Sequence, residues 1–381
     1  MLSLFINLGL LCYFKYTNFL GETFASLTGG TFTAMDIFLP VGISFFTFQS
    51  LSYTIDVYRR QITPLGSLLD YAFYVSFFPQ LVAGPIVRAR DFIPQIRRPL
   101  FVSREMFGRG IFLIVSGLFK KAVISDYISV NFVERIFDNP TLYSGVENLM
   151  GVYGYALQIY CDFSGYSDMA IGMGKMLGFD FPQNFNFPYI SRSITEFWRR
   201  WHMTLSGWFR EYVYIPLGGN RKGLKRQIFN LFVVELLTGI WHGANWNFIC
   251  WGLYYFVLLA LEKLFLLPYL KKGRVWPHIY TLFLVVIGWA MFVGNDAGVE
   301  FGLLFRKLFI PSGGVMPLYF LRNYGVLLAV SVVCCTPLIE KLWKLLSRNA
   351  ITKALTILVL LTVSMAYVVG STNSPFLYFN F

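Results

Sequence analysis

The sequence predicts an all-α protein that crosses a membrane several times and forms one domain over residues 1–381. Hydrophobic residues make up 56% of the chain and charged residues only 14%, whereas soluble proteins average roughly a quarter charged residues. The mean hydropathy is +0.56. The apolar residues form long runs without an internal repeat or a low-complexity linker. A water-soluble fold of this size could not bury so much apolar surface, so the runs are expected to face lipid.

Several apolar runs are long enough to cross a hydrocarbon core of roughly 30 Å at about 1.5 Å per helical residue. The uncharged stretch between Asp36 and Asp56 predicts a spanning helix. Leu2–Phe14 is shorter and ends at Lys15, and because it has no basic start and no small-residue cleavage site, it favours a membrane segment over a signal peptide. The other predicted spans are Tyr71–Val87, Ala244–Leu261, Tyr280–Val293, Tyr324–Ile339 and Ala354–Val369.

The formal net charge of +12 comes from basic residues that lie between the apolar runs. Two connections, 88–109 and 192–226, are strongly basic, and a third stretch holds Lys263, Lys271, Lys272 and Arg274. By the positive-inside rule they are expected to lie cytoplasmic. The charge therefore indicates membrane orientation and not nucleic-acid binding. The five cysteines show no CxxC or Cys/His spacing, so no metal site is predicted.

Other apolar stretches are interrupted by charges. Ile111–Phe119 runs into Lys120 and Lys121, Leu149–Phe179 contains Asp162 and Asp168, and Ile228–Trp241 contains Glu235 and leads to His242. A charge at membrane depth is tolerated only where protein or a water-filled cavity surrounds it. These interruptions are therefore expected to mark the interior of the helix bundle.

Two of the three histidines are candidate catalytic residues, because imidazole is well matched to proton transfer near neutral pH. His242 lies in TGIWHGANWNF, where Gly239 and Gly243 allow close backbone approach; its alternative is a hydrogen-bonded core histidine. His202 lies in ITEFWRRWHMTLSGWFREYVY, which also suits an interfacial helix anchored by Trp and Arg. His278 follows Pro277 in a basic connection, where a solvated residue is expected.

Further polar residues are candidates for contact with a substrate. The loop Tyr214–Arg226 combines a Gly-Gly-Asn turn with several cations, which suits a phosphate-bearing ligand or a plain cytoplasmic turn. Glycines at 165, 172, 174 and 178 offer small surfaces for helix contact, whereas no dinucleotide fingerprint and no hydrolase elbow is present. The candidate contact residues are Asp162, Ser164, Ser167, Asp168, Trp198, Arg199, Arg200, Arg221, Lys222, Trp241 and Asn245.

Three segments together resemble the membrane-bound O-acyltransferase family: DFSGYSDMAIGMGKMLGF, NFNFPYISRSITEFWRRWHMTLSGWFREYVYIPLGGNRKG and GIWHGANWNF. The likeness runs from about Tyr13 to the final SPFLYFNF and is greatest for the bacterial polysaccharide branch, which includes the membrane subunit of alginate O-acetylation. The resemblance implies that His242 is the intramembrane catalytic histidine and His202 the second histidine. It also implies a ring of tilted helices around a central tunnel. Members of this branch usually carry further apolar segments before the region that resembles Tyr13–Tyr16, so this chain is expected to lack N-terminal helices of the family.

For function, the resemblance implies a protein of the bacterial cytoplasmic membrane that takes an acetyl group from a cytoplasmic thioester, with acetyl-CoA as the donor and no tightly bound cofactor. The implied partner is an extracytoplasmic SGNH-type acetyltransferase that modifies a polysaccharide, and the stretch Pro375–Phe381 is expected to face it.

Transfer from a thioester to a hydroxyl needs a base and a group that stabilises the oxyanion. His242 suits the first role. His202, with Asn245 or the indole of Trp241, suits stabilisation or proton relay, while Arg199, Arg200, Arg221 and Lys222 suit the phosphates of coenzyme A. Two other classes remain open: a transporter or channel that uses Asp162, Asp168 and Glu235 as relay groups, and a scaffold that only recruits an extracytoplasmic enzyme.

Overall fold

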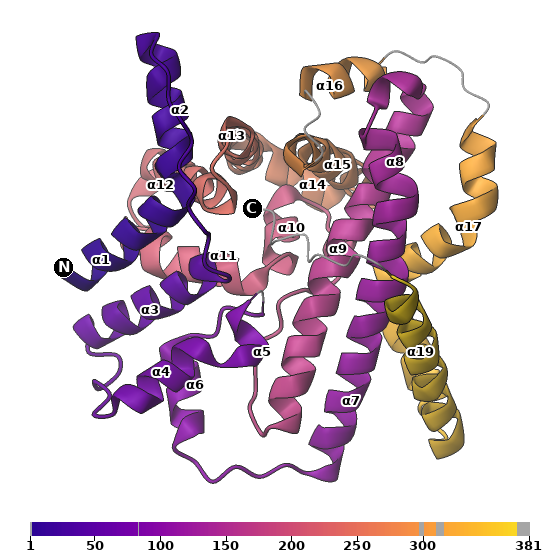
Figure 1. Ribbon diagram of the computed structural model, residues 1–381, viewed down its shortest axis with the longest axis horizontal. Helices are drawn as coiled ribbons and strands as arrows, with labels where there is room; N and C mark the ends of the chain where they lie inside the picture. The colour runs from indigo at the N-terminus through magenta and orange to yellow at the C-terminus, as the bar shows by residue number, and fades with distance from the viewer. Residues whose placement is uncertain (1, 83, 297–300, 310–315, 372–381) are drawn as a thin grey trace.

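The computed structural model describes residues 2–82, 84–296, 301–309 and 316–371, and every regular element in these ranges is a helix (Figure 1). The predicted all-α class is therefore confirmed. The first half of the chain forms α1 Leu2–Leu11, α2 Thr17–Thr28, α3 Ile43–Tyr58, α4 Leu68–Ser76, α5 Phe78–Leu81, α6 Ala89–Ile96, α7 Arg104–Leu118, α8 Glu134–Phe137 and α9 Gly145–Met176.

The second half contains the two candidate histidines and most of the long apolar helices. It forms α10 Ile194–Arg200, α11 Met203–Phe209, α12 Gly223–His242, α13 Trp246–Leu261, α14 Leu267–Lys272, α15 Trp276–Asp296, α16 Phe301–Phe309, α17 Met316–Cys334, α18 Leu338–Leu346 and α19 Ala350–Gly370. Short π-helical turns continue several helices, at Cys12–Tyr16, Phe119–Asp126, Ser129–Val133, Arg210–Tyr214 and Glu262–Leu266, and 3₁₀ turns lie at Pro140–Leu142 and Pro188–Ile190.

Within the described residues, four helical segments are long and apolar enough to cross a membrane: Trp246–Lys272, Trp276–Val293, Pro317–Cys334 and Ala350–Gly370. Apolar side chains on α19 face outward, such as Leu358 and Val359, which are 57% and 59% exposed. Large apolar surfaces of this kind are stable against lipid and not against water. The chain therefore has the helix composition of a multi-pass membrane protein, as the sequence predicts.

Two predicted spans, 280–293 and 354–369, lie within these helices, and a third, 244–261, begins two residues before the helix that starts at Trp246. The predicted span 324–339 is partly wrong, because α17 ends at Cys334 and α18 begins only after Pro337. Proline lacks the N–H that would continue the hydrogen-bond ladder, so it separates the two helices. The segment Leu2–Phe14 is helical and continues through Cys12–Tyr16 into α2.

Two predicted spans are wrong as continuous helices. Residues 30–42 are not helical, and α3 begins only at Ile43, after Gly42 with its φ of 75°. A Cβ at Gly42 would lie 2.3 Å from the carbonyl oxygen of Leu81, so this turn needs glycine. In the run 71–87, α4 ends at Ser76, Pro79 lies in the short α5, and residues 84–87 are not helical. Hydrophobicity alone did not reveal these breaks.

The long helices α7 and α9 pack along each other (Figure 1). Their backbones touch at two levels. A Cβ added to Gly117 would lie 2.5 Å from the carbonyl oxygen of Gly165, and one added to Gly110 would lie 2.8 Å from that of Gly172. This confirms that Gly165 and Gly172 provide helix contacts, a typical use of small residues in membrane proteins.

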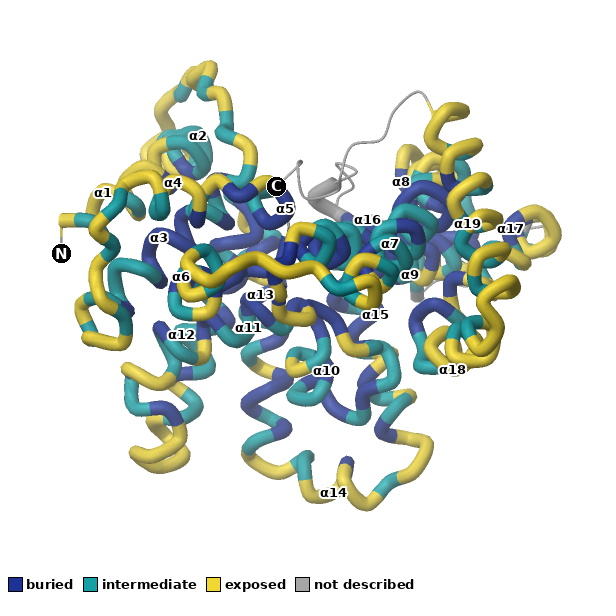
Figure 2. The backbone as a smooth tube through the Cα atoms, turned by 90° about the horizontal axis from the view of Figure 1, so that it is seen from below, coloured by how far each residue is buried: buried dark blue, intermediate teal, exposed yellow. Residues whose placement is uncertain are grey.

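A second close pair, α12 and α13, holds the segment that ends at His242. A Cβ on Gly239 would lie 2.4 Å from the carbonyl oxygen of Phe248, and one on Gly252 would lie 2.4 Å from that of Glu235. Helix α15 also packs against α13. Buried backbone is concentrated in the middle of the molecule, between these helices and α9 to α11 (Figure 2). The fully buried aromatic side chains there include Trp201, Trp251, Trp289 and Tyr255.

The three basic connections touch one another. Arg88 and Arg90 both form ion pairs with Glu211, which joins the first connection to the second. Arg192 donates to the backbone carbonyls of Lys271, at 3.3 Å, and Gly273, which joins the second connection to the third. Burial opposes the charge of Arg90, but its hydrogen bond to Glu211 and the charge of that carboxylate raise the pKa of Arg90 above its usual value. These contacts agree with a shared membrane side for the three stretches.

Candidate functional site

His242 is the last residue of α12 and is 4% exposed. The helix stops because Gly243 adopts an extended conformation with φ of −170° and because Asn245 caps the next helix, its Oδ1 accepting from the N–H of Asn247 at 3.0 Å. The Nδ1 atom of His242 lies 2.7 Å from the carbonyl oxygen of Thr238, one helical turn earlier. A carbonyl can only accept, so Nδ1 carries the proton and Nε2 of the neutral ring carries the lone pair.

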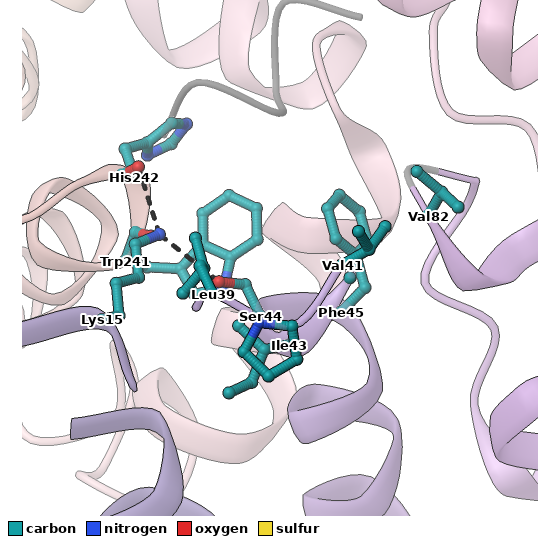
Figure 3. A pocket seen from close by; sticks show the side chains of 11 residues that line it. Lys15, Leu39, Val41, Ile43, Ser44, Phe45, Val82, Trp241 and His242 are labelled. Atoms are coloured by element: carbon teal, nitrogen blue, oxygen red, sulfur yellow. Dashed lines mark hydrogen bonds between the residues drawn. The ribbon is translucent and has the colours of Figure 1, made fainter. Parts of the chain in front are cut away.

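Two consecutive residues, Lys15 and Tyr16, cap the end of α12. The Lys15 ammonium donates to the carbonyl oxygens of Trp241 at 2.6 Å and His242 at 3.3 Å, and the Tyr16 hydroxyl donates to that of Ile240 at 2.6 Å. Lys15 also reaches Ser44 Oγ at 3.3 Å (Figure 3). The last carbonyls of a helix have no partner within the helix. Here the N-terminal part of the chain supplies those partners and fixes the position of His242.

A cavity of about 100 Å³ reaches His242 (Figure 3). Its wall combines the Lys15 side chain with the turn before α3 and with the end of α12. The lining residues are Lys15, Leu39, Pro40, Val41, Gly42, Ile43, Ser44, Phe45, Val82, Trp241 and His242. Its lining joins apolar side chains to a few polar groups, as in ligand sites, and its volume is smaller than the roughly 300–1,000 Å³ of most such sites. His242 is thus a buried, hydrogen-bonded histidine that also lines a cavity.

His202 lies behind this wall and is 1% exposed. Its ring centroid is 6.0 Å from that of Trp241, which is itself 5.0 Å from the ring of His242. The ring of Phe45 lies 6.4 Å from that of His202 and 5.7 Å from that of Trp241. The structure therefore brings both predicted histidines together, with Trp241 between them.

Local backbone geometry places His202. The residue lies in the turn between α10 and α11 with φ of 41°, a left-handed conformation that a residue with a Cβ adopts rarely. The N–H of Met203 donates to the carbonyl oxygen of Asn184 at 2.8 Å, and the ring of Phe163 meets the His202 ring edge-on at 4.7 Å. Strained conformations of this kind concentrate at functional sites.

The predicted polar residues of α9 lie in two different environments. Asp168 and Ser164 contact Lys120 Nζ at 2.6 and 3.1 Å, and Asp162 pairs with Lys121 at 2.7 Å. They do not line the cavity at His242. Ser167 differs, because its Oγ accepts from Asn184 Nδ2 at 3.1 Å, which connects it to the neighbourhood of His202. The predicted contacts of Asp162, Ser164 and Asp168 with a substrate stay predictions.

The remaining predicted residues divide between interior and surface. Trp241 lines the cavity, and its Nε1 atom is buried without a hydrogen-bond partner in the described part of the chain. Trp198 packs against Trp251 and Tyr255 at ring distances of 5.5 and 4.9 Å. Arg200 pairs with Glu196, one helical turn earlier. Exposed residues away from the cavity lining are Arg199, Arg221, Lys222 and Asn245.

Sequence reasoning missed Lys15, Tyr16 and Asn184. Lys15 carried a usable signal, since it is a single cation directly after an apolar run, and such residues usually have a defined partner. Its partner lies more than 200 residues further along the chain, so no local pattern reveals it. Asn184 has no comparable signal, because asparagine is common in turns such as PQNFNFP.

Three proteins with similar sequences carry names that refer to alginate, peptidoglycan and teichoic acid. The chain is 43% identical over 308 residues to the probable alginate O-acetylase AlgI of Pseudomonas aeruginosa, covering 78% of this chain and 58% of that protein. It is 33% identical over 435 residues to the peptidoglycan O-acetyltransferase of Helicobacter pylori, covering 100% of this chain and 82% of that protein. It is 30% identical over 277 residues to the teichoic acid D-alanyltransferase of Bacillus subtilis, covering 67% of this chain and 69% of that protein.

The chain spans about three fifths of the length of the probable alginate O-acetylases that it matches, 58% in Pseudomonas aeruginosa and 62% in Pseudomonas putida. The sequence profile described as "MBOAT, membrane-bound O-acyltransferase family" matches residues 57–297, which include both histidines of the site. Together with the helix composition, this match identifies the chain as a multi-pass membrane protein that belongs to the membrane-bound O-acyltransferase family.

Proposed function

We propose that this protein is an O-acyltransferase that moves an acetyl group from a cytoplasmic thioester, acetyl-CoA, to a hydroxyl acceptor for the O-acetylation of a cell-surface or extracellular polysaccharide. The observation that carries the proposal is His242, which lines a cavity and donates from Nδ1 to the carbonyl oxygen of Thr238. The similarity of the chain to proteins named as probable alginate O-acetylase and peptidoglycan O-acetyltransferase supports acetyl as the transferred group and a polysaccharide as the final acceptor.

In the proposed reaction, Nε2 of His242 takes the proton of the acceptor hydroxyl while its oxygen attacks the carbonyl carbon of the thioester. A C–O bond forms and the C–S bond breaks. The coenzyme leaves as a thiolate that recovers the proton from His242, so the histidine ends unchanged. The proton on Nδ1 stays on the ring and remains hydrogen-bonded to the carbonyl oxygen of Thr238, which holds the ring in one orientation during the whole cycle.

The oxyanion of the intermediate needs a hydrogen-bond donor near the cavity. The Nε1–H of Trp241 is such a donor, since this ring lines the cavity beside His242 and its N–H is buried without a partner in the described part of the chain. Asn245 is less suited, because it is exposed and does not line the cavity. Trp241 is therefore the preferred residue for this role.

The protein is proposed to lie in the bacterial cytoplasmic membrane. Acetyl-CoA is proposed to arrive from the cytoplasmic side, where the basic connections are expected to lie. Arg199, Arg221 and Lys222 are exposed there, so their cations are available for the phosphates of coenzyme A. A ring of helices around a central tunnel would let donor and acceptor approach from opposite sides. The proposed partner is an extracytoplasmic SGNH-type acetyltransferase that passes the group to the polymer; the stretch Pro375–Phe381 predicted to face it lies outside the described residues.

Purified protein in sealed vesicles, given acetyl-CoA labelled in the acetyl group together with the partner and a polysaccharide, tests the proposal. We expect label in the polymer with the wild-type chain, none with His242→Ala, and unchanged transfer with His278→Ala, which controls for the loss of a histidine. Transfer that survives His242→Ala would exclude the proposed mechanism. Uptake of a solute driven by an ion gradient without any transfer would favour the transporter alternative.

A further inference from the structure

The side chain of Asn184 lies at the centre of a buried hydrogen-bond network around His202. Its Oδ1 atom is 3.0 Å from Nδ1 of His202, 3.3 Å from the backbone nitrogen of Thr204 and 2.9 Å from the Thr204 hydroxyl. Its Nδ2 atom is 3.1 Å from Oγ of Ser167 on α9. Asn184 is 1% exposed, so water does not compete for these contacts.

The backbone of Thr204 fixes the orientation of the Asn184 amide. A peptide N–H can only donate, so the atom that faces it must be the oxygen of the amide and not its nitrogen. The Thr204 hydroxyl accepts from the N–H of Ile86 at 3.0 Å and is thereby free to donate its proton to the same oxygen. The usual ambiguity between the two ends of an asparagine amide is therefore removed here.

The orientation of the amide in turn fixes the tautomer of His202. Because Oδ1 of Asn184 can only accept, Nδ1 of His202 must carry a proton, and Nε2 of the neutral ring must carry a lone pair. This Nε2 atom is buried and has no hydrogen-bond partner in the part of the chain that the structure describes. A buried polar atom without a partner costs about 1–3 kcal/mol, so its retention suggests a partner that arrives with the substrate.

We propose that Asn184 is a positioning residue for acyl transfer, which holds His202 as the Nδ1–H tautomer and so presents Nε2 as a hydrogen-bond acceptor for an N–H or O–H group of the substrate. This rests on the proposed acyltransferase function. The proposed tautomer also excludes His202 as the donor to the oxyanion, because Nε2 carries no proton and the Nδ1 proton is held by Asn184. The oxyanion is then stabilised by another hydrogen-bond donor, the indole N–H of Trp241. His202 orients a substrate group.

Nitrogen NMR of ¹⁵N-histidine-labelled protein in detergent micelles reads the tautomer directly. The chain has three histidines, so spectra of His242→Gln and His278→Gln variants assign the signals of His202. We expect a protonated Nδ1 and an unprotonated Nε2 in the wild type, and a change toward protonated Nε2 in Asn184→Leu. A protonated Nε2 in the wild type would overturn the proposal, as would an unchanged tautomer in Asn184→Leu. This measurement needs no activity, so it stands even if the acyltransferase assay fails.

Kinetics then separate a positioning role from a purely structural one. Asn184→Leu is expected to lower kcat by about 10- to 100-fold, as loss of supporting hydrogen bonds typically does, with less than about threefold change in donor KM. Asn184→Asp keeps the accepting oxygen and is expected to recover most of the lost rate. The control is Asn148→Leu, an equally buried asparagine whose Nδ2 donates to the carbonyls of Pro140, Tyr143 and Ser144. An equal loss of kcat per folded molecule in Asn148→Leu would contradict the proposal.

Discussion

The carbonyl oxygen of Thr238 accepts a hydrogen bond from Nδ1 of His242, at 2.7 Å. Both residues belong to α12, one helical turn apart, so the helix itself fixes the orientation of the imidazole ring. Because Gly243 ends the helix directly afterwards, the ring lies at a helix terminus and not along its side. Nε2 is thereby the unprotonated nitrogen of the neutral ring, and the local backbone determines this before any substrate binds.

We expect His202 and His242 to act as one unit in the transfer. His242→Ala should lower kcat by about 100- to 10,000-fold, the usual contribution of a positioned acid or base, and His202→Ala should also lower kcat because the substrate group loses its acceptor. The double variant should be scarcely slower than the His242→Ala variant, because groups that act on one step are strongly non-additive. The measurement is the initial rate of label transfer at saturating donor for the three variants. Losses that multiply fully in the double variant would show that the two residues act independently.

Lys15→Met should destabilise the protein, because it leaves the carbonyls of Trp241 and His242 without their donor. We expect a loss of about 1–3 kcal/mol, the cost of unpaired buried polar groups, together with a lower kcat because His242 moves. Tyr16→Phe removes one contact, to Ile240, and should cost about 0.5–1.5 kcal/mol.

The melting temperature of the purified protein in detergent checks this prediction. Lys344→Met serves as the control, since Lys344 is exposed on α18. An equal drop in melting temperature for Lys15→Met and Lys344→Met would refute the capping role.

Gly117→Ala should weaken the packing of α7 on α9, because the new Cβ would lie 2.5 Å from the carbonyl oxygen of Gly165. Overpacking of a close helix contact typically costs about 1–3 kcal/mol. Gly108→Ala in the same helix is the matched control, since a Cβ there meets nothing within 4 Å. It should be neutral or stabilise by about 0.5–1 kcal/mol through better helix propensity. Thermal unfolding of both variants gives the comparison, and an equal effect of the two would contradict the observed contact.

Lys120→Met should destabilise the protein, because Asp168 loses the ammonium that lies 2.6 Å from its carboxylate. We expect the free energy of unfolding to fall by about 1–3 kcal/mol. This loss is smaller than for a fully buried ion pair, because the Asp168 side chain is 30% exposed. The exchanged pair Lys120→Asp with Asp168→Lys should recover part of that loss. Donor KM in the exchanged variant is the second readout. A raised KM at recovered stability would support the predicted contact of Asp168 with the donor.

Much of the site could be predicted from the sequence because its residues are unusual for their surroundings. His242 and His202 stand out as imidazoles among tryptophans. Ionisable side chains within membrane segments are rare, and they usually mark functional sites. The cations at 120 and 121 and the acids at 162 and 168 were likewise visible as interruptions, although their pairing was not. Pairing depends on how α9 lies against Phe119–Asp126, and single-sequence patterns carry no such distance information.

The sequence by itself determined that the protein is helical and membrane-embedded, because these properties follow from composition and the length of apolar runs. It did not determine where the runs break, since the breaks before α3 and at Pro79 depend on backbone contacts such as that of Gly42 with Leu81. Tertiary structure alone decided that Lys15 caps the helix of His242 and that Asn184 sets the tautomer of His202. Both are contacts between distant segments, and their strength comes from burial, which removes the competing water.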